Sequence, residues 1–394
     1  MGLVVYNLLI LALIPFYPLV KLKARKRGSI SLFPRFRVDF KGGKGKILLH
    51  VASIGEVNSV KPIVERLKDR VALTVFTDYG LERSKKLFPS VPSRILPIDI
   101  YPIVKNFLKK NRPSKILIYE TEIWLSFLYA AKRLNIPVYI ISGKITEKSF
   151  KNFRKFKRFL APVFENIVFL ARSKEDFERA KLLGFKKVEL VGDLKLEIEK
   201  PKELAKLEIK GKRKVIIWGS THEGEEELAF KVHSELKKDF PNLLTIIAPR
   251  HVNRAKDILP RFPFALRSKT QEISEDVEVY IVDTIGELSS LYRFADVAII
   301  GGSFVKGIGG HNPVEAVVWS KPVIVGEYAK DFLEIAKDLN IPILNERDLI
   351  SFLRELLLND DYRKKVIDKI ANSFDKRKNV LKRILEAVGE CDGS

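Results

Sequence analysis

Acidic and basic side chains follow several apolar runs in this sequence. HVASIGE places Glu56 after the first such run, YETEIW places Glu120 and Glu122 after another, GDLK brings Lys195, and APRH brings Arg250. A carboxylate can act as a general base, and an arginine is well suited to a phosphate. Together these groups indicate a cleft enzyme that uses a nucleotide.

Glu56 has a structural interpretation as well as a catalytic one. Ser53-x-x-Glu56 has the spacing of a capping box, in which the glutamate ties the start of its own helix. The sequence alone favours this structural role over a general base. The same ambiguity affects Glu223, three residues after Ser220, and Glu287, three residues after Thr284.

The stretch GGSFVKGIGGHNPVEA, residues 301–316, is a glycine-rich loop between two apolar runs. Its glycines allow positive φ and a close backbone approach to a ligand. Asn312 is a good N-cap and Pro313 a good first helical residue, so we expect a helix over residues 313–319. Its start would favour a phosphate or carboxylate, and Glu315 could accept ribose hydroxyls. An ordinary strand-loop-helix connection remains the alternative.

Strand and helix patterns alternate along most of the chain, which predicts an α/β fold with parallel, doubly wound sheets. The pattern stops in a charged stretch and then restarts, so we expect two Rossmann-like domains that face each other across a cleft. The predicted divisions are an apolar and basic segment at 1–45, a first domain at 46–196, a linker at 197–214, a second domain at 215–372, and a final helical segment at 373–394 that could cross back to the first domain.

The N-terminus and the net charge of +22 indicate an anionic membrane surface. Residues 3–20 carry no charge and are followed at once by KLKARKR, which places the rest of the chain in the cytoplasm. This run is near the minimum length for a span and contains Pro15 and Pro18, so spanning and lying in one leaflet both remain open. Residues 148–164 form a second cationic, aromatic stretch suited to headgroups or to ordinary packing. Nucleic-acid-binding motifs are missing from the sequence, which argues against nucleic acid as a partner.

Taken together, the motifs resemble those of the Kdo (3-deoxy-D-manno-oct-2-ulosonic acid) transferases of lipopolysaccharide synthesis. The resemblance spans nearly the whole chain and rests on SIGE, YETEIW, GDLK, GSTHEGEE, APRH, DTIGEL and GGSFVKGIGGHNPVEA in that order. It implies an inverting glycosyltransferase of the GT-B architecture at the inner membrane. The implied donor is CMP-Kdo, the implied acceptor is a lipid A precursor, and neither a metal nor another cofactor is expected.

The resemblance also implies roles for particular residues. Glu56 would accept the proton of the acceptor hydroxyl, and Glu120 and Lys195 would stabilise the transition state. CMP would be bound by three short segments: Pro249 and Arg250; Ile285, Gly286 and Glu287; and Asn312, Pro313, Val314 and Glu315. Helices starting at Ile285 and Pro313 would point their dipoles at the nucleotide.

The sequence departs from the family pattern in three places. Family members commonly have Gly-Glu-Arg after the basic segment, where this chain has Ser31 and no glutamate before Glu56. The glycine-rich loop is one residue longer than usual, and Lys144 stands where an arginine is usual. The competing interpretations are another GT-B transferase, a nucleotide-sugar epimerase, and a membrane-anchored basic binding protein with an inactive cleft.

Overall fold

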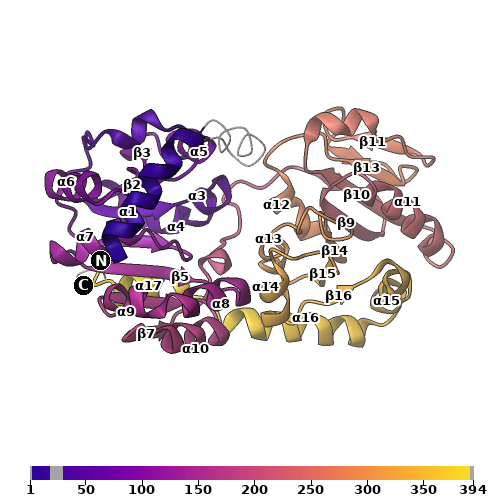
Figure 1. Ribbon diagram of the computed structural model, residues 1–394. Helices are drawn as coiled ribbons and strands as arrows, with labels where there is room; N and C mark the ends of the chain where they lie inside the picture. The colour runs from indigo at the N-terminus through magenta and orange to yellow at the C-terminus, as the bar shows by residue number, and fades with distance from the viewer. Residues whose placement is uncertain (1, 18–29, 391–394) are drawn as a thin grey trace. The chain divides into compact units, whose positions relative to one another are not determined.

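The chain folds into two compact units, each built on its own parallel sheet (Figure 1). The structure is a computed structural model that describes residues 2–17 and 30–390. Unit 1 consists of residues 1–197 together with 379–394, and unit 2 consists of residues 198–378.

Unit 1 contains a sheet of seven parallel strands in the order β3-β2-β1-β4-β5-β6-β7. The strands are β1 (Ile47–Val51), β2 (Val71–Val75), β3 (Ser93–Ile95), β4 (Ile116–Tyr119), β5 (Val138–Gly143), β6 (Ile167–Ala171) and β7 (Lys187–Leu190). Leu48 and Leu49 point to opposite faces of β1 and enter different hydrophobic clusters. Burial on both faces explains why these parallel strands read as continuous apolar runs.

Helices cover both faces of this sheet. They are α1 (Gly2–Leu13), α3 (Ile54–Ser59), α4 (Lys61–Leu67), α5 (Asp78–Leu87), α6 (Tyr101–Asn111), α7 (Leu125–Arg133), α8 (Glu147–Lys155), α9 (Lys157–Phe164), α10 (Lys174–Leu183) and α17 (Val380–Ala387), with short 3-10 turns η1 (Ile14–Phe16), η2 (Phe33–Phe36), η3 (Lys68–Arg70) and η4 (Leu194–Leu196). The apolar spacing of residues 57–70 predicts a single helix, but the structure divides this segment among α3, α4 and η3. The chain begins a new helix at Lys61 because Pro62 has no N–H to continue the hydrogen-bond pattern of α3.

Unit 2 has a second seven-stranded parallel sheet, in the order β11-β13-β10-β9-β14-β15-β16. Its strands are β9 (Lys214–Thr221), β10 (Leu243–Pro249), β11 (Phe264–Leu266), β13 (Val279–Ile281), β14 (Val297–Ile300), β15 (Val323–Gly326) and β16 (Ile343–Leu344), and a separate pair joins β8 (Glu208–Ile209) to β12 (Glu272–Ile273). Its helices are α11 (Glu225–Leu236), α12 (Leu288–Leu291), α13 (Val314–Val317), α14 (Leu333–Asp338), α15 (Glu346–Leu358) and α16 (Asp360–Asp375), with 3-10 turns η5 (Val252–Asp257) and η6 (Tyr292–Phe294).

Each sheet has one point where the chain reverses its direction of winding. In unit 1 this point lies between the adjacent strands β1 and β4, and in unit 2 it lies between β9 and β14. Ligands of doubly wound proteins bind outside the carboxyl ends of the strands at such points. The two pairs of strand ends are therefore where functional side chains are expected.

The C-terminal helix α17 completes the core of unit 1. Val380, Ile384 and Leu385 are buried in the same cluster as Leu49. Figure 1 shows this helix, coloured yellow, among the magenta elements of unit 1.

Helix α1 lies on unit 1 and is held there by polar side chains. The Tyr6 hydroxyl donates to Oδ2 of Asp99 at 2.7 Å, and Oδ1 of Asn7 accepts from the Tyr101 N–H at 2.6 Å. The helix ends at Leu13, earlier than the apolar run of residues 3–20, of which 18–20 lie outside the described residues. No helix in residues 2–17 and 30–390 is both long and apolar enough to cross a bilayer.

Candidate active site

The three acid-base residues expected in the first half follow different strands of the unit 1 sheet. Glu56 lies in α3 after β1, Glu120 directly follows β4, and Lys195 lies in η4 after β7. The Nζ atom of Lys195 is 3.1 Å from Oε1 of Glu120. Glu120 has a φ of +56°, a conformation that costs energy for a residue other than glycine and that often occurs at functional sites.

Glu56 has the capping contacts that the sequence predicts. Ser53 is the N-cap of α3, and the Ala52 N–H donates to Oε2 of Glu56 at 2.7 Å. Burial raises the pKa of Glu56 to about 8; the Ala52 N–H opposes the shift, and Glu120 and Glu122 add to it. Glu56 can therefore cap α3 and also act as an acid or base, because its tethered carboxyl group exchanges its proton near neutral pH.

The charges on Glu120 and Lys195 stabilise each other. Burial disfavours the ionised form of Glu120, but Lys195 and Lys144 outweigh this effect and lower its pKa. Burial likewise disfavours the charge on Lys195, whereas Asp193 and Glu120 outweigh it and raise its pKa. The Glu120–Lys195 ion pair thus lies beside Glu56, whose carboxyl group remains protonated to a higher pH than that of Glu120.

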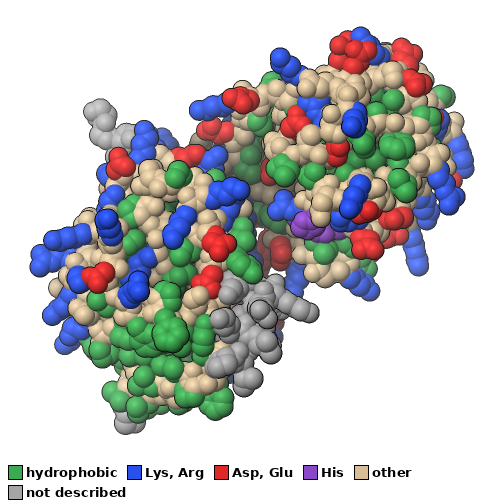
Figure 2. Space-filling view, turned by 90° about the horizontal axis from the view of Figure 1, so that it is seen from above, with side chains coloured by type: hydrophobic (Ala, Val, Ile, Leu, Met, Phe, Trp, Pro, Cys, Tyr) green, Lys and Arg blue, Asp and Glu red, His purple; other side chains and the backbone are tan. Residues whose placement is uncertain are grey.

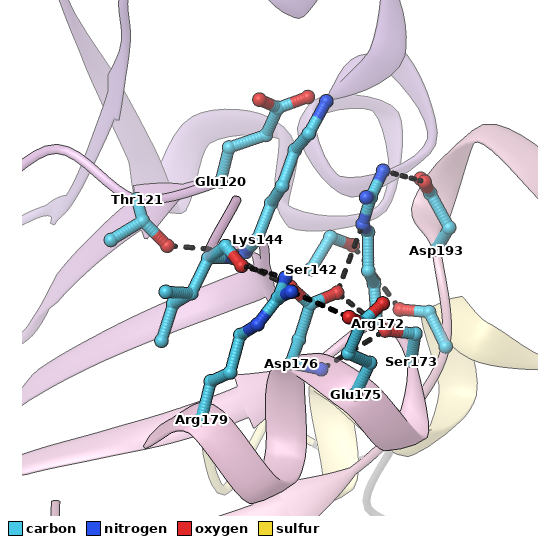
Figure 3. A network of polar contacts seen from close by, with 12 residues as sticks. Glu120, Thr121, Ser142, Lys144, Arg172, Ser173, Glu175, Asp176, Arg179 and Asp193 are labelled. Carbon is cyan, nitrogen blue, oxygen red and sulfur yellow. Dashed lines mark hydrogen bonds and ion pairs between the residues drawn. The ribbon is translucent and has the colours of Figure 1, made fainter. Parts of the chain in front are cut away.

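A polar network positions the residues around this ion pair (Figure 3). Buried Arg172 contacts Asp176 at 3.2 Å and Asp193 at 3.5 Å, and Asp193 in turn accepts from the Lys195 N–H at 2.9 Å. The Lys144 side chain extends toward Glu120, so it supplies a cationic group there, where the family resemblance leads us to expect an arginine. Arg172 and Asp176 were not singled out from the sequence, because only the tertiary fold brings the end of β6 and the start of α10 to this site.

Glu122, the second acid of YETEIW, is held by two neighbours. Its Oε2 atom lies 2.7 Å from Nε2 of buried His50 and accepts from the Trp124 indole N–H at 3.1 Å. His50 is the penultimate residue of β1, so the site gains a histidine contact that the sequence analysis did not predict.

The expected nucleotide-binding residues in unit 2 occupy different environments. Pro249 ends β10, and the Arg250 N–H donates to the Thr221 carbonyl at 2.9 Å. Burial raises the pKa of Glu315, and the Arg250 guanidinium partly offsets the shift. Arg250 and Glu315 thus lie close enough to interact.

Glu287 is already paired within the protein. The Arg267 guanidinium donates to both of its carboxylate oxygens, at 2.6 and 3.0 Å, and the Thr284 hydroxyl donates to it as well. The helix expected from Ile285 is wrong at its start, because α12 begins at Leu288 and has 4 residues. Ile285 is 86% exposed, and Gly286 has a φ of +91° that a turn requires.

The helix expected over residues 313–319 is also shorter in the structure. Helix α13 runs over 4 residues, Val314–Val317, with Pro313 as its N-cap. Oδ1 of Asn312 accepts from the Val314 N–H at 3.0 Å, and Val314 is buried. Helices α12 and α13 have 4 residues each and add little dipole, so neither predicted helix start supplies the dipole expected for the nucleotide.

A buried carboxylate, Glu225, holds the start of the glycine-rich loop. It accepts from the N–H groups of Gly302 at 2.6 Å, Ser303 at 3.1 Å and Phe304 at 2.9 Å, and from the His222 N–H at 2.9 Å. These backbone donors, which could otherwise bind a phosphate, are occupied by the protein itself. The sequence does not reveal this role, because Glu225 and the loop are 77 to 79 residues apart.

Ser31, the departure from the family pattern, lies next to an acid from another element. Its hydroxyl donates to Oδ2 of Asp78, the first residue of α5, at 2.9 Å. A carboxylate is therefore present beside this position although the N-terminal segment does not supply one.

Two doubly wound parallel sheets, each with polar side chains at its switch point, define an α/β protein of the GT-B class. A UDP-GlcNAc 2-epimerase from Neisseria meningitidis shares the fold, with a TM-score of 0.55 at 16% identity over 86% of this chain and 100% of that one. The profile of the 3-deoxy-D-manno-octulosonic-acid transferase family matches residues 26–198.

Similar sequences identify the family. This chain is 34% identical to the 3-deoxy-D-manno-octulosonic acid transferase of Aquifex aeolicus over 81% of its own length and 88% of the relative's. It is 33% identical to the enzyme of that name from Haemophilus influenzae, over 74% and 73% of the two chains. The chain belongs to the Kdo transferase family and is a glycosyltransferase.

Proposed function

We propose that this protein transfers Kdo from CMP-Kdo to a lipid A precursor, with inversion at the anomeric carbon and without a metal or other cofactor. The observation that carries this proposal is the partly buried Glu56 carboxyl group beside the Glu120–Lys195 ion pair at the switch point of unit 1. Family membership supports the transferred sugar.

In the proposed mechanism, ionised Glu56 accepts the proton of the acceptor hydroxyl while the hydroxyl oxygen attacks the anomeric carbon. The bond from that carbon to the phosphate oxygen breaks, and its electron pair remains on the departing CMP. Lys195 stays protonated through its contact with Glu120 and stabilises negative charge in the transition state. The CMP group is assigned to Pro249, Arg250, Ile285, Gly286, Glu287, Asn312, Pro313, Val314 and Glu315.

We further propose that the reaction takes place on the cytoplasmic face of the inner membrane, where unit 1 binds anionic lipid. Helix α1 exposes Val4, Leu8 and Leu9 to 63, 59 and 60%, and Gly2 on the same helix packs against Phe159, which is itself 60% exposed. Figure 2 shows a broad hydrophobic area on unit 1 with lysine and arginine side chains along part of its edge. Apolar side chains with basic neighbours suit insertion among anionic headgroups.

The direct test is a transfer assay. The full chain is incubated in detergent with freshly generated CMP-Kdo and a tetraacyl lipid A precursor, and the lipid is analysed by mass spectrometry. A mass gain of one or more Kdo units in the wild type, absent for Glu56→Gln, is the expected result. Unchanged lipid from a folded wild-type protein that binds CMP would refute the assigned acceptor or sugar, and conversion of a free nucleotide sugar would identify an epimerase instead.

A further inference from the structure

Three of the five histidines of the chain meet at the carboxyl end of the unit 2 sheet. His222 follows β9, His251 follows β10, and His311 lies in the glycine-rich loop after β14. The rings of His222 and His311 are nearly parallel, with centroids 5.1 Å apart, and His251 meets His222 edge-on at 5.8 Å. Histidine side chains are visible as a purple cluster on the surface of this unit (Figure 2).

The two stacked histidines share a proton. The Nε2 atoms of His222 and His311 are 2.8 Å apart, a distance that requires one hydrogen between them. One ring donates and the other accepts, so the accepting ring is neutral. The pair can therefore carry a charge of zero or +1, and the geometry excludes two imidazolium groups.

The protein backbone fixes this pair in place. Glu225 accepts from the N–H of His222 and from that of Gly302, and thus ties together the two segments that carry the paired rings. A Cβ atom on Gly302 would lie 3.1 to 3.2 Å from the His311 ring, and its φ of +67° also favours glycine. Gly302 therefore allows the close approach of His311.

The charged groups around the pair determine its protonation. Burial, helped by Arg250 and the other two histidines, lowers the pKa of His311 to about 4. Burial also lowers the pKa of His222, with further contributions from His251 and Arg254, while Glu226 opposes the shift. Other charged groups on the packed elements are Glu223 next to His222, Glu225, Lys306 in the loop, Asp331 beside Gly309, and Glu315 near Arg250. Without ligand, the pair is thus neutral at pH 7, with Arg250 and Arg254 as the neighbouring cations that act on it.

A bound phosphate group would raise the proton affinity of the histidine pair. It would neutralise Arg250 and favour an additional positive charge on the rings. During sugar transfer the phosphate of a CMP-sugar changes from a singly charged diester to a more highly charged monoester, because the electron pair of the broken bond remains on it. A proton taken from solvent by the histidine pair would offset that added charge.

We propose that His222, His251, His311 and Arg250 form the subsite for the phosphate of a cytidine nucleotide, and that the His222–His311 pair takes up one proton when this anion binds. The inference rests on the proposed function, which names a CMP-sugar as the donor. Of the four residues assigned to the donor phosphate, only Arg250 belongs to the three predicted CMP-binding segments. The shared proton of the pair is the feature that distinguishes this site from an ordinary cationic patch.

The test is an NMR titration of the full chain labelled at histidine, in which five residues give few signals. Titrations from pH 5 to 9 are recorded without ligand, with saturating CMP and with inorganic phosphate at the same concentration. CMP is expected to raise the pKa of His222 or His311 by at least one unit, a tenfold gain in proton affinity. His233, held by Thr245 at 2.9 Å elsewhere in unit 2, is the internal control and is expected to remain unchanged.

A variant provides an independent measurement. His311→Asn is expected to weaken CMP binding at least tenfold and to abolish the CMP-induced shift of His222, whereas the exposed control Lys269→Gln is expected to bind CMP normally. CMP binding with unchanged titration of both paired histidines would refute the subsite but not the proposed function. An equal effect of inorganic phosphate would refute the nucleotide assignment, and a wild type that binds no CMP would refute both the subsite and the donor.

Discussion

Nζ of Lys195 lies 3.1 Å from Oε1 of Glu120, a residue 75 positions earlier in the chain. The contact joins the ends of two strands that are not adjacent in the unit 1 sheet, β4 and β7. Because each group raises the ionised fraction of the other, the pair holds both a positive and a negative charge in a largely buried environment.

Replacing Lys195 by methionine is expected to impair catalysis more than folding. The variant loses the cation while keeping an apolar stem of similar length, and we expect kcat/KM for Kdo transfer to fall at least tenfold. Unfolding free energy should fall by roughly 2 kcal/mol, less than for a fully buried pair, because the two side chains remain 17 and 25% exposed. Steady-state kinetics and urea unfolding measure the two effects, and Lys195→Arg is the charge-retaining control. Wild-type kinetics in the methionine variant would contradict a catalytic role.

The catalytic role of Glu56 predicts a characteristic pH profile. A base with a pKa of about 8 is mostly protonated at pH 6, so kcat/KM is expected to rise nearly tenfold per pH unit below 8 and to level off above it. Glu56→Gln and Glu56→Ala should lower transfer by about 10²- to 10⁴-fold while CMP binding persists. A flat profile between pH 6 and 8.5, or near-normal turnover by either variant, would rule out the general-base assignment.

The same carboxyl group predicts a pH-dependent stability difference. Native Glu56 keeps its proton up to about pH 8, whereas the unfolded chain releases it near the ordinary value of 4.5. The stabilising contribution is therefore complete below pH 4.5 and is lost as pH rises toward 8, with a slope of up to ~1.4 kcal/mol per unit. Thermal or urea unfolding of the wild type and of Glu56→Gln from pH 5 to 9 measures this difference. The wild type should lose stability relative to the variant as pH rises, and parallel curves would show that the pKa is not raised.

Glu225 should be essential for the order of the glycine-rich loop. Glu225→Gln replaces one acceptor oxygen by an NH₂ group that faces backbone donors, so we expect a loss of about 2 to 4 kcal/mol in unfolding free energy and weaker CMP binding. Glu227→Gln, an exposed change on the same helix, is the matched control. Chemical unfolding and calorimetry of CMP binding measure both effects. Equal stability of the two variants would show that the carboxylate contacts contribute little.

Lipid binding by helix α1 can be tested on its exposed face. The double variant Leu8→Glu, Leu9→Glu is expected to lower binding to anionic vesicles more than tenfold, because each buried leucine contributes about 1.5 to 3 kcal/mol. Leu358→Glu, at a site 62% exposed in unit 2, is the control. Vesicle sedimentation measures binding, and a detergent assay checks that the enzyme remains active. Unaltered sedimentation of the double variant would place the lipid contact elsewhere.

The buried strands were predictable from sequence because their apolar runs are local signals. The apolar run at residues 297–300 forms β14, and the apolar run at residues 215–218 lies within β9. Helix starts were less predictable: Asn312 and Pro313 have good capping chemistry, yet tertiary packing leaves α13 only 4 residues long. The β8–β12 pair was missed because its strands have 2 residues each and no periodicity to detect.

The site was predictable only where a motif or a family resemblance marked it. Glu120 and Lys195 were singled out in this way, but their contact depends on the tertiary arrangement of β4 and β7. The His222–His311 pair went unnoticed because the rings come from segments 89 residues apart that become neighbours through the pairing of β9 with β14. Such contacts require the strand order, which a single sequence does not supply.

The position of helix α17 also constrains how the polypeptide is made. Val380, Ile384 and Leu385 fill part of the unit 1 core, yet they are synthesised after the whole of unit 2. Unit 2, which ends at residue 378, is complete before they emerge. The larger part of unit 1, although synthesised before unit 2, therefore completes its packing after unit 2. A nascent chain stalled near residue 378 would combine a finished unit 2 with an open apolar surface on unit 1 that chaperones can bind.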